Sequence, residues 1–190
     1  MSDRDADAGS DPDPDPEPEA DLDHEARDGY VEVADTALYV QDRGPVDAPP
    51  LLALHGGPGI GDGDKPLGAL SEFAGDYRLV VPDHRGCGRS RLDPPYTNER
   101  FAADVEALRT TLGLGDVAIY GGSYGGFITQ QYAVDYPEHL VGMVFRDTAA
   151  TYEYDLVARE TARARLPDVR ERDLDCPHIT AAALDLVMDG

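Results

Sequence analysis

Hydrophobic and polar residues follow a regular order along this chain from residue 30 onward, and that order predicts a series of strands. Apolar and polar positions alternate over residues 30–33 and again over residues 36–41, with Ala34 and Asp35 between them. Alternation with a period of two is typical of strands, and a two-residue connection is typical of a hairpin turn. We therefore expect these two segments to form an antiparallel hairpin.

Four short apolar runs follow the hairpin and lack this alternation. They cover residues 51–54, 78–81 (where Arg78 precedes three apolar residues), 117–120 and 141–145. Short continuous apolar runs are typical of strands that are buried on both faces, as in a parallel sheet. Together with the hairpin they predict a sheet of six strands.

Helices are expected between the buried strands. One is predicted over residues 66–74, a second over residues 98–111 with Asn98 as its N-cap, and a third over residues 127–136. The second has apolar residues at helical spacing, namely Phe101, Val105, Leu108 and Leu112. Strands that alternate with helices predict an α/β fold with a mostly parallel sheet and flanking helices.

The segment between the strand at 117–120 and the third helix carries the pattern G-x-S-x-G, formed by Gly121, Ser123 and Gly125. On a strand-to-helix turn this pattern holds a serine in a strained conformation, with its hydroxyl exposed above the end of the sheet. We predict that Ser123 is a nucleophile and that the backbone N–H of Tyr124 stabilises an oxyanion. The alternative is a glycine-rich loop that contains a serine by chance.

Two further loops are expected beside Ser123, because the carboxyl ends of parallel strands meet at one edge of the sheet. They are the segment His-Gly-Gly-Pro-Gly at residues 55–59 and the segment 83–90. The peptide N–H of Gly57 is a candidate second oxyanion donor. A nucleotide-binding loop is the alternative, but it would need a Gly-Lys-Ser or Gly-Lys-Thr, which is missing, and nearby acids would repel phosphate.

These three segments, in this order and spacing, resemble the α/β-hydrolase superfamily, and segments 55–59 and 121–126 resemble the proline iminopeptidases in particular. The resemblance covers residues 29–150, which are expected to form the N-terminal part of an α/β-hydrolase core, its first six strands. It implies a peptidase that removes an N-terminal residue, often proline, through an acyl-enzyme on Ser123. It also implies a helical cap, which would begin in residues 151–190.

Two histidines lie in the predicted loops. Members of the family commonly carry glutamine at the position of His84, and we favour a hydrogen bond that braces the loop as its role, over a catalytic one. His55 is likewise expected to be structural rather than a base.

A serine nucleophile needs a histidine base and an acid that orients it, and α/β-hydrolases place them in the order serine, acid, histidine. Only 67 residues follow Ser123, and the resemblance places both partners beyond the cap. We therefore assign no acid and no base, and we expect a chain that is truncated before them and inactive or weak on its own. His139 is predicted at the opposite edge of the sheet, and His178 in the cap.

Three alternatives stay open at this point. An esterase-type α/β-hydrolase would use the same scaffold, because a fold does not fix the substrate. A non-catalytic fragment would bind a peptide or small molecule at the same edge of the sheet. A second polypeptide could also complete the fold by supplying the missing strands and the histidine.

Charge narrows the choice of partners. The net charge is −22, and Lys65 is the only lysine. Residues 1–28 contribute −10 from twelve acids and two arginines, and this segment is expected to be a disordered acidic tail. An acidic surface repels nucleic acids and anionic membranes, so we expect neither as a partner. The same surface predicts a protein adapted to molar salt, which screens the self-repulsion.

The remaining composition predicts a cytoplasmic protein. The sequence has no run of about 20 apolar residues and no apolar signal segment near its start. Cys87 and Cys176 are too few for a disulfide framework and are expected to be free thiols. We expect no metal and no cofactor.

Overall fold

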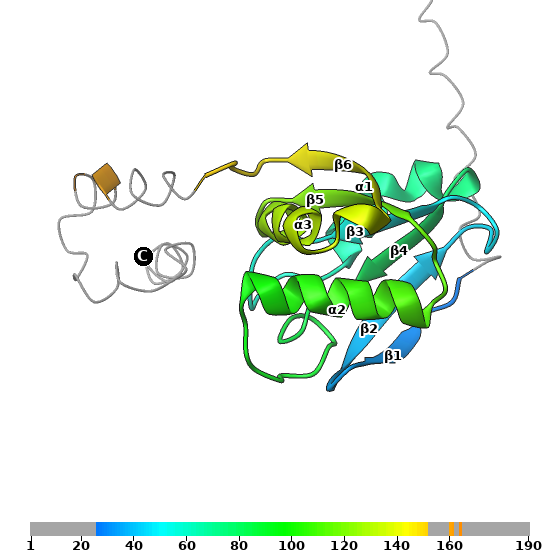
Figure 1. The fold of residues 1–190 in the computed structure, drawn as a ribbon, viewed down its shortest axis with the longest axis horizontal. Helices are drawn as coiled ribbons and strands as arrows, with labels where there is room; N and C mark the ends of the chain where they lie inside the picture. The colour runs from blue at the N-terminus through cyan, green and yellow to red at the C-terminus, as the bar shows by residue number, and fades with distance from the viewer. Residues whose placement is uncertain (1–25, 152–159, 162–163, 165–190) are drawn as a thin grey trace, which may run out of the picture.

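A six-stranded sheet forms the centre of the molecule, in the order β1-β2-β4-β3-β5-β6 (Figure 1). The computed structural model of the 190-residue chain describes residues 26–151 together with residues 160, 161 and 164. The strands are β1 (Gly29–Val33), β2 (Thr36–Arg43), β3 (Pro50–Leu54), β4 (Arg78–Pro82), β5 (Val117–Gly122) and β6 (Leu140–Arg146). β2 pairs antiparallel with β1 and β4, whereas β4, β3, β5 and β6 run parallel. The predicted hairpin and mostly parallel sheet are confirmed.

Helices cover both faces of this sheet. α2 (Asn98–Thr111) and α3 (Tyr124–Asp135) lie side by side on one face, and α1 (Asp64–Leu70) lies on the other (Figure 1). Two short 3-10 helices, η2 (Ser71–Gly75) and η3 (Pro137–His139), lead into β4 and β6. Both faces of the central strands β3, β4 and β5 are thus covered, which explains their continuous apolar runs.

The first predicted helix differs from the observed one. A single helix over residues 66–74 is wrong, because α1 ends at Leu70 and a 3-10 helix follows. The backbone angles of Leu70, φ −112° and ψ 7°, lie outside the α-helical region, so the chain changes its winding there.

The other two helices begin earlier than predicted or are capped by another residue. The N-cap of α2 is Thr97 rather than Asn98, because the Thr97 hydroxyl accepts a hydrogen bond from the backbone N–H of Arg100. α3 begins at Tyr124 rather than at residue 127, because the glycines after Ser123 are part of the helix.

Two apolar cores lie on the two faces of the sheet. The larger core, under α2 and α3, includes the predicted apolar stripe of α2 and two side chains of α3, namely Phe101, Val105, Leu108, Ile128 and Tyr132. The smaller core, under α1, is formed by Ala53, Leu79, Val81 and Tyr120, with Leu67 and Leu70 packed on it. Burial of each large aliphatic side chain contributes about 1.5–3 kcal/mol. These cores hold the carboxyl ends of β3, β4 and β5 in register.

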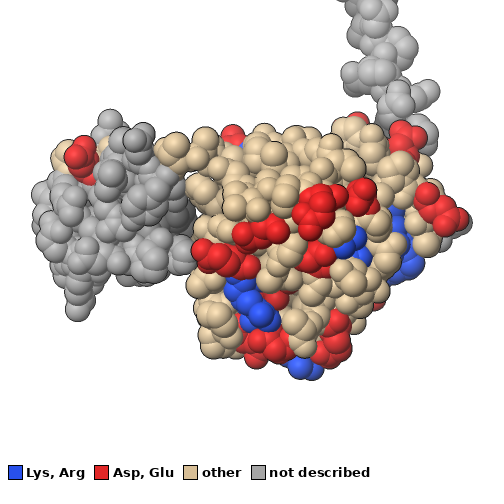
Figure 2. All heavy atoms as spheres, viewed as in Figure 1, with Lys and Arg blue, Asp and Glu red and all other residues tan. Residues whose placement is uncertain are grey.

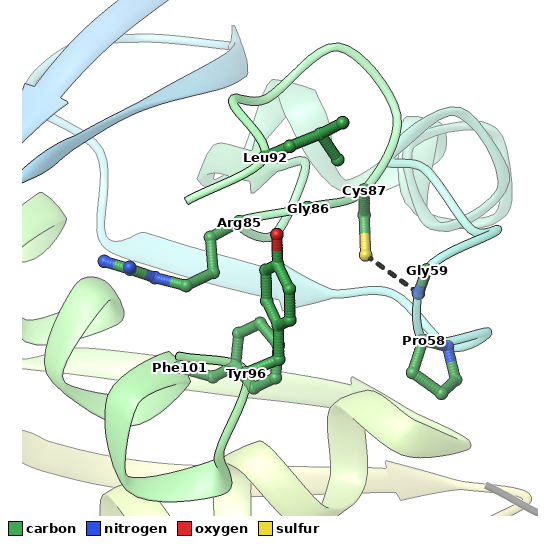
Figure 3. A pocket seen from close by; sticks show the side chains of 8 residues that line it. All are labelled: Pro58, Gly59, Arg85, Gly86, Cys87, Leu92, Tyr96 and Phe101. Atoms are coloured by element: carbon green, nitrogen blue, oxygen red, sulfur yellow. Dashed lines mark hydrogen bonds between the residues drawn. The ribbon is translucent and has the colours of Figure 1, made fainter. Parts of the chain in front are cut away.

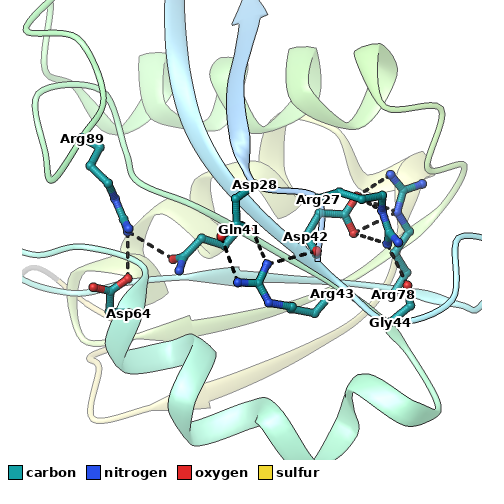
Figure 4. Close-up of polar contacts among 9 residues, drawn as sticks. All are labelled: Arg27, Asp28, Gln41, Asp42, Arg43, Gly44, Asp64, Arg78 and Arg89. Atoms are coloured by element: carbon teal, nitrogen blue, oxygen red, sulfur yellow. Dashed lines mark hydrogen bonds and ion pairs between the residues drawn. The ribbon is translucent and has the colours of Figure 1, made fainter. Parts of the chain in front are cut away.

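Ion pairs fix the hairpin to the rest of the sheet (Figure 4). The buried carboxylate of Asp42 on β2 lies 2.7 Å from Arg78 of β4 and 2.8 Å from Arg27. Arg27 and Asp28, the last described residues of the predicted tail, take part in this anchor, since Asp28 pairs with Arg43. Residues 1–25 lie outside the described residues, so their disorder stays a prediction.

A buried ion pair joins the loop after β4 to α2. The guanidinium of Arg85, whose side chain is fully buried, donates two hydrogen bonds to the carboxylate of Asp104, at 2.5 and 2.7 Å. It also donates to the carbonyl of Asp93 at 2.9 Å. Because an unpaired buried charge is very unfavourable, these contacts fix the loop in one position.

β6 forms one edge of the described sheet. It pairs with β5 and with no second strand among the described residues. Its exposed large apolar side chains are Val141, Met143, Val144 and Phe145.

Within the part of the chain that the structure describes, no helix has the length and apolar character needed to cross a membrane. Most of the predicted cap, residues 151–190, lies outside that part.

Candidate active site

Ser123 is the single residue between β5 and α3, at a sharp turn of the chain. Its backbone angles are φ 50° and ψ −115°, a conformation that residues other than glycine rarely adopt. Its backbone N–H donates to the carbonyl of Arg146 at 2.8 Å, and its carbonyl accepts from Gly126 at 3.0 Å. The residue is exposed at the carboxyl edge of the sheet. The structure therefore presents Ser123 as the predicted elbow would.

Glycines on both sides make this turn sterically possible. A Cβ atom on Gly125 would lie 2.2 Å from the carbonyl oxygen of Leu54, so β3 and α3 touch through backbone. A Cβ atom on Gly121 would lie 2.5 Å from the hydroxyl of Thr129 and 2.8 Å from the carbonyl of Gly125. The glycines therefore set how closely α3 approaches the sheet.

The loop at residues 55–59 lies directly against Ser123, as predicted from the shared edge of the strands. A Cβ atom on Gly56 would lie 2.8 Å from the Cβ atom of Ser123. Gly57 has φ +69°, and its carbonyl accepts hydrogen bonds from the backbone N–H groups of Ile60 at 3.1 Å and Gly61 at 2.6 Å. The loop is a tight turn whose backbone faces the serine.

Gly57 and Ser123 line one cavity of about 320 Å³. Tyr124, the other predicted oxyanion donor, is the first residue of α3. Sequence reasoning missed four polar or charged residues that line the same cavity, namely Lys65, Tyr120, Arg146 and Asp147. Arg146 is the last residue of β6 and Asp147 follows it, at the same edge as Ser123, so strand order is the signal that places them there.

His55 and His84 form a stacked pair behind the turn, with ring centres 4.0 Å apart. The backbone N–H of His84 donates to Nε2 of His55 at 3.1 Å, so Nδ1 of His55 carries the proton and donates to the carbonyl of Gly56 at 2.7 Å. Nε2 of His84 donates to the carbonyl of His55 at 3.2 Å. Both rings are thus neutral and engaged, in the loop-bracing role that the sequence favoured.

Burial lowers the pKa of both histidines. For His55, desolvation outweighs the hydrogen bond to Gly56 and the nearby Asp83, which favour the charged form. For His84, desolvation and the neighbouring His55 lower the pKa well below its usual range. A proton on either ring would place a charge inside the loop that faces Ser123.

Asp83 ties the 83–90 loop to the end of the loop that joins β3 to α1, residues 55–63. Its buried carboxylate accepts hydrogen bonds from the backbone N–H of Gly63 at 2.7 Å, and from the backbone and side chain of Arg89, both at 2.8 Å. Burial raises the pKa of Asp83, but the donors of Arg89 and Gly63 outweigh it and hold that pKa below its usual value. The carboxylate therefore stays charged and keeps the loops together.

A second cavity of about 200 Å³ is lined by the end of the 55–59 loop, at Pro58 and Gly59, and by residues 85–87 (Figure 3). The rings of Tyr96 and Phe101 form one wall, and the buried thiol of Cys87 accepts a hydrogen bond from the backbone N–H of Gly59 at 3.2 Å. Burial raises the pKa of Cys87. Cys87 is a free thiol as predicted, and Cys176 lies outside the described residues.

The described histidines offer no hydrogen bond to Ser123. His55 and His84 bond to each other and to backbone, and His139 lies at the amino end of β6, with Nδ1 3.4 Å from the carboxylate of Asp116. Ser123 follows the opposite end of β5, roughly 20 Å away along the strands. His178 lies outside the described residues, so its predicted place in the cap is untested.

Known proteins share this fold. Residues 49–175, more than half of the chain, match the family model of the alpha/beta hydrolase fold. The chain therefore belongs to the α/β-hydrolase family, as its motifs indicated.

Within this family the chain is similar to proline iminopeptidases. The proline iminopeptidase of Pestalotiopsis fici is 36% identical over 142 residues, which cover 74% of this chain and 50% of that protein. That of Neisseria meningitidis is 37% identical over 125 residues, or 62% of this chain and 39% of that protein. A crystal structure of a proline iminopeptidase-related protein from Thermus thermophilus has a TM-score of 0.67 at 28% identity, covering 78% of this chain and 54% of that one. The chain thus spans about half the length of these relatives, or less.

The glycine contacts predict that Gly125→Ala distorts the elbow. The new methyl group would meet the backbone of β3, so we expect a loss of about 1–3 kcal/mol in the free energy of unfolding. Gly68→Ala is the matched control, because a Cβ atom there meets nothing within 4 Å and alanine favours helix α1. Urea unfolding measures both variants, and equal stability of the two would contradict the account of the elbow.

The histidine pair predicts a loss of stability in mild acid. The unfolded chain binds protons below about pH 6.5, whereas the folded chain resists them, so stability should fall as the pH drops from about 7.5 to about 5.5. His84→Gln keeps an N–H donor for the carbonyl of His55 and removes one titrating ring. Its free energy of unfolding should fall by about 1 kcal/mol less over this range. An identical pH slope in both proteins would refute this effect.

Proposed function

We propose that this chain is the nucleophile-bearing part of a serine hydrolase of the proline iminopeptidase type. Such an enzyme would remove the N-terminal residue, often proline, from a short peptide or related small substrate. The observation that supports this best is the exposed Ser123 at φ 50°, held against the backbone of Gly56. The similarity to proline iminopeptidases supports the choice of substrate over that of an esterase.

In the proposed reaction, Oγ of Ser123 attacks the carbonyl carbon of the N-terminal residue and forms a C–O bond. The carbonyl oxygen becomes an oxyanion that the amides of Gly57 and Tyr124 would stabilise, one such donor being worth about 10²–10³ in rate. A base takes the serine proton and passes it to the leaving amine as the C–N bond breaks. Water then hydrolyses the acyl-enzyme and restores the serine.

The base and its acid are proposed to come from outside the described residues. His55, His84 and His139 are engaged elsewhere, as their hydrogen bonds show. The exposed apolar side chains of β6 support the proposal that further strands cover this edge of the sheet. These strands would come either from the same polypeptide or from a second one. Without a complete triad, a serine hydrolase keeps only about 10³–10⁴ of rate enhancement over water, so we infer weak activity for this chain alone.

Hydrolysis of prolyl, alanyl and leucyl arylamides and of short acyl esters tests this function. We expect slow hydrolysis by this chain, faster hydrolysis by a version extended to the length of its relatives, and the highest rate with the prolyl arylamide. Ser123→Ala should reduce the rate at least about 10³-fold in the extended version. Ser71→Ala, on η2, is the matched control. Unchanged hydrolysis by Ser123→Ala would rule out the proposed nucleophile.

We also propose that the protein works in a cytoplasm of high salt. Acidic side chains spread over the face shown in Figure 2, and the few basic ones lie beside them. With a net charge of −22, the folded chain repels itself at low ionic strength. Thermal unfolding should therefore shift to higher temperature between about 0.1 and about 2 M KCl. A midpoint that stays constant or falls would argue against adaptation to salt.

A further inference from the structure

One cation in the described part of the chain has no acidic partner, and it lies at the cavity of Ser123. All nine described arginines have a carboxylate within 3.7 Å, four of them in Figure 4. They are Arg27, Arg43, Arg78, Arg85, Arg89, Arg91, Arg100, Arg109 and Arg146. Lys65, the only lysine of the sequence, forms no ion pair with any described residue. In so acidic a chain, a lysine without a carboxylate partner is available to bind an anionic group of a ligand.

The cavity that Lys65 lines carries a positive charge. Its charged lining residues are Lys65, Arg146 and Asp147, two cations and one acid, which gives a net charge of +1. Asp147 accepts a hydrogen bond from Nε of Arg146 at 3.1 Å, so the charges of these two residues offset each other. The net positive charge of the lining is then that of Lys65. The whole chain, by contrast, carries −22.

The acids that flank Lys65 in the sequence are engaged with other groups. Asp64 lies 2.9 Å from the guanidinium of Arg89 (Figure 4). Asp62 accepts a hydrogen bond from the backbone N–H of Asp64 at 3.1 Å. Neither carboxylate lines the cavity.

We propose that Lys65 binds a carboxylate of the substrate beside Ser123. This inference rests on the proposed function. The N-terminal ammonium of an aminopeptidase substrate would be repelled by Lys65, so the carboxylate belongs to the other side of the scissile bond. The cavity of about 320 Å³ suits a short leaving group. The substrate class is therefore short peptides, above all dipeptides, whose free C-terminal carboxylate lies next to the bond that breaks.

Calorimetric titration of the full chain with peptides tests this site directly. The Ser123→Ala background prevents turnover, so binding is measured apart from catalysis. The peptides are Pro-Gly, its amide Pro-Gly-NH2, and Pro-Glu-NH2, which has only a side-chain carboxylate. We expect Pro-Gly to bind about three- to tenfold more tightly than its amide at low salt, as for a partly exposed ion pair, and less so at high salt. Pro-Glu-NH2 should resemble the amide, and tight binding of it would show that the site accepts a side-chain carboxylate instead, against the proposed class.

Substitutions assign the preference to Lys65. Lys65→Gln should bind Pro-Gly and its amide equally, and Lys65→Arg should restore the preference. Arg91→Gln is the matched control, since it removes the same charge from an exposed residue that pairs with Glu32 at 3.7 Å and does not line the cavity. Equal binding of acid and amide by the Lys65-containing chain, no binding of either, or an unchanged preference in Lys65→Gln would each overturn the proposal. Hydrolysis of uncharged prolyl arylamides reports on the proposed function separately.

Discussion

The close approach of backbone to backbone where β3, β5 and α3 meet is the constraint on which the rest of this structure depends. It is possible only because Gly121 and Gly125 carry no side chain, and it holds Ser123 in a strained conformation with a positive φ. Such strain costs of the order of 1–3 kcal/mol and persists only where packing over-determines it. Here the packing comes from α3, whose Ile128 and Tyr132 are completely buried in the larger core.

Polar contacts then hold the surrounding loops in place without using the serine. Asp83 joins the two loops, the His55–His84 pair fixes the backbone of the first, and Arg85 binds the second to α2 through Asp104. These groups are buried and satisfied, so the backbone that faces Ser123 is preorganised rather than formed on binding. The residues that line the cavity differ from these buried groups, since the exposed Lys65 has no acidic partner among the described residues.

The elbow and the loop at residues 55–59 beside it were predictable, from local sequence and from the shared edge of parallel strands, whereas the cavity residues Lys65 and Arg146 were not. G-x-S-x-G between a strand and a helix specifies the elbow, because glycines are needed within a few residues of Ser123. The cavity partners Lys65 and Arg146 follow from β5 lying between β3 and β6, a long-range arrangement that no pattern along the chain encodes. The start of α2 was also mispredicted: Thr97 and Asn98 are both good caps, and the hydroxyl that accepts from the backbone N–H of Arg100 is that of Thr97.

Covalent labelling with a fluorophosphonate, mapped by mass spectrometry, tests most directly whether the elbow makes Ser123 a nucleophile. The account predicts slow labelling of the folded chain that is confined to Ser123 and spares the partly exposed Ser71, and that is lost when urea unfolds the turn. Labelling spread over several serines, or unchanged in urea, would contradict it.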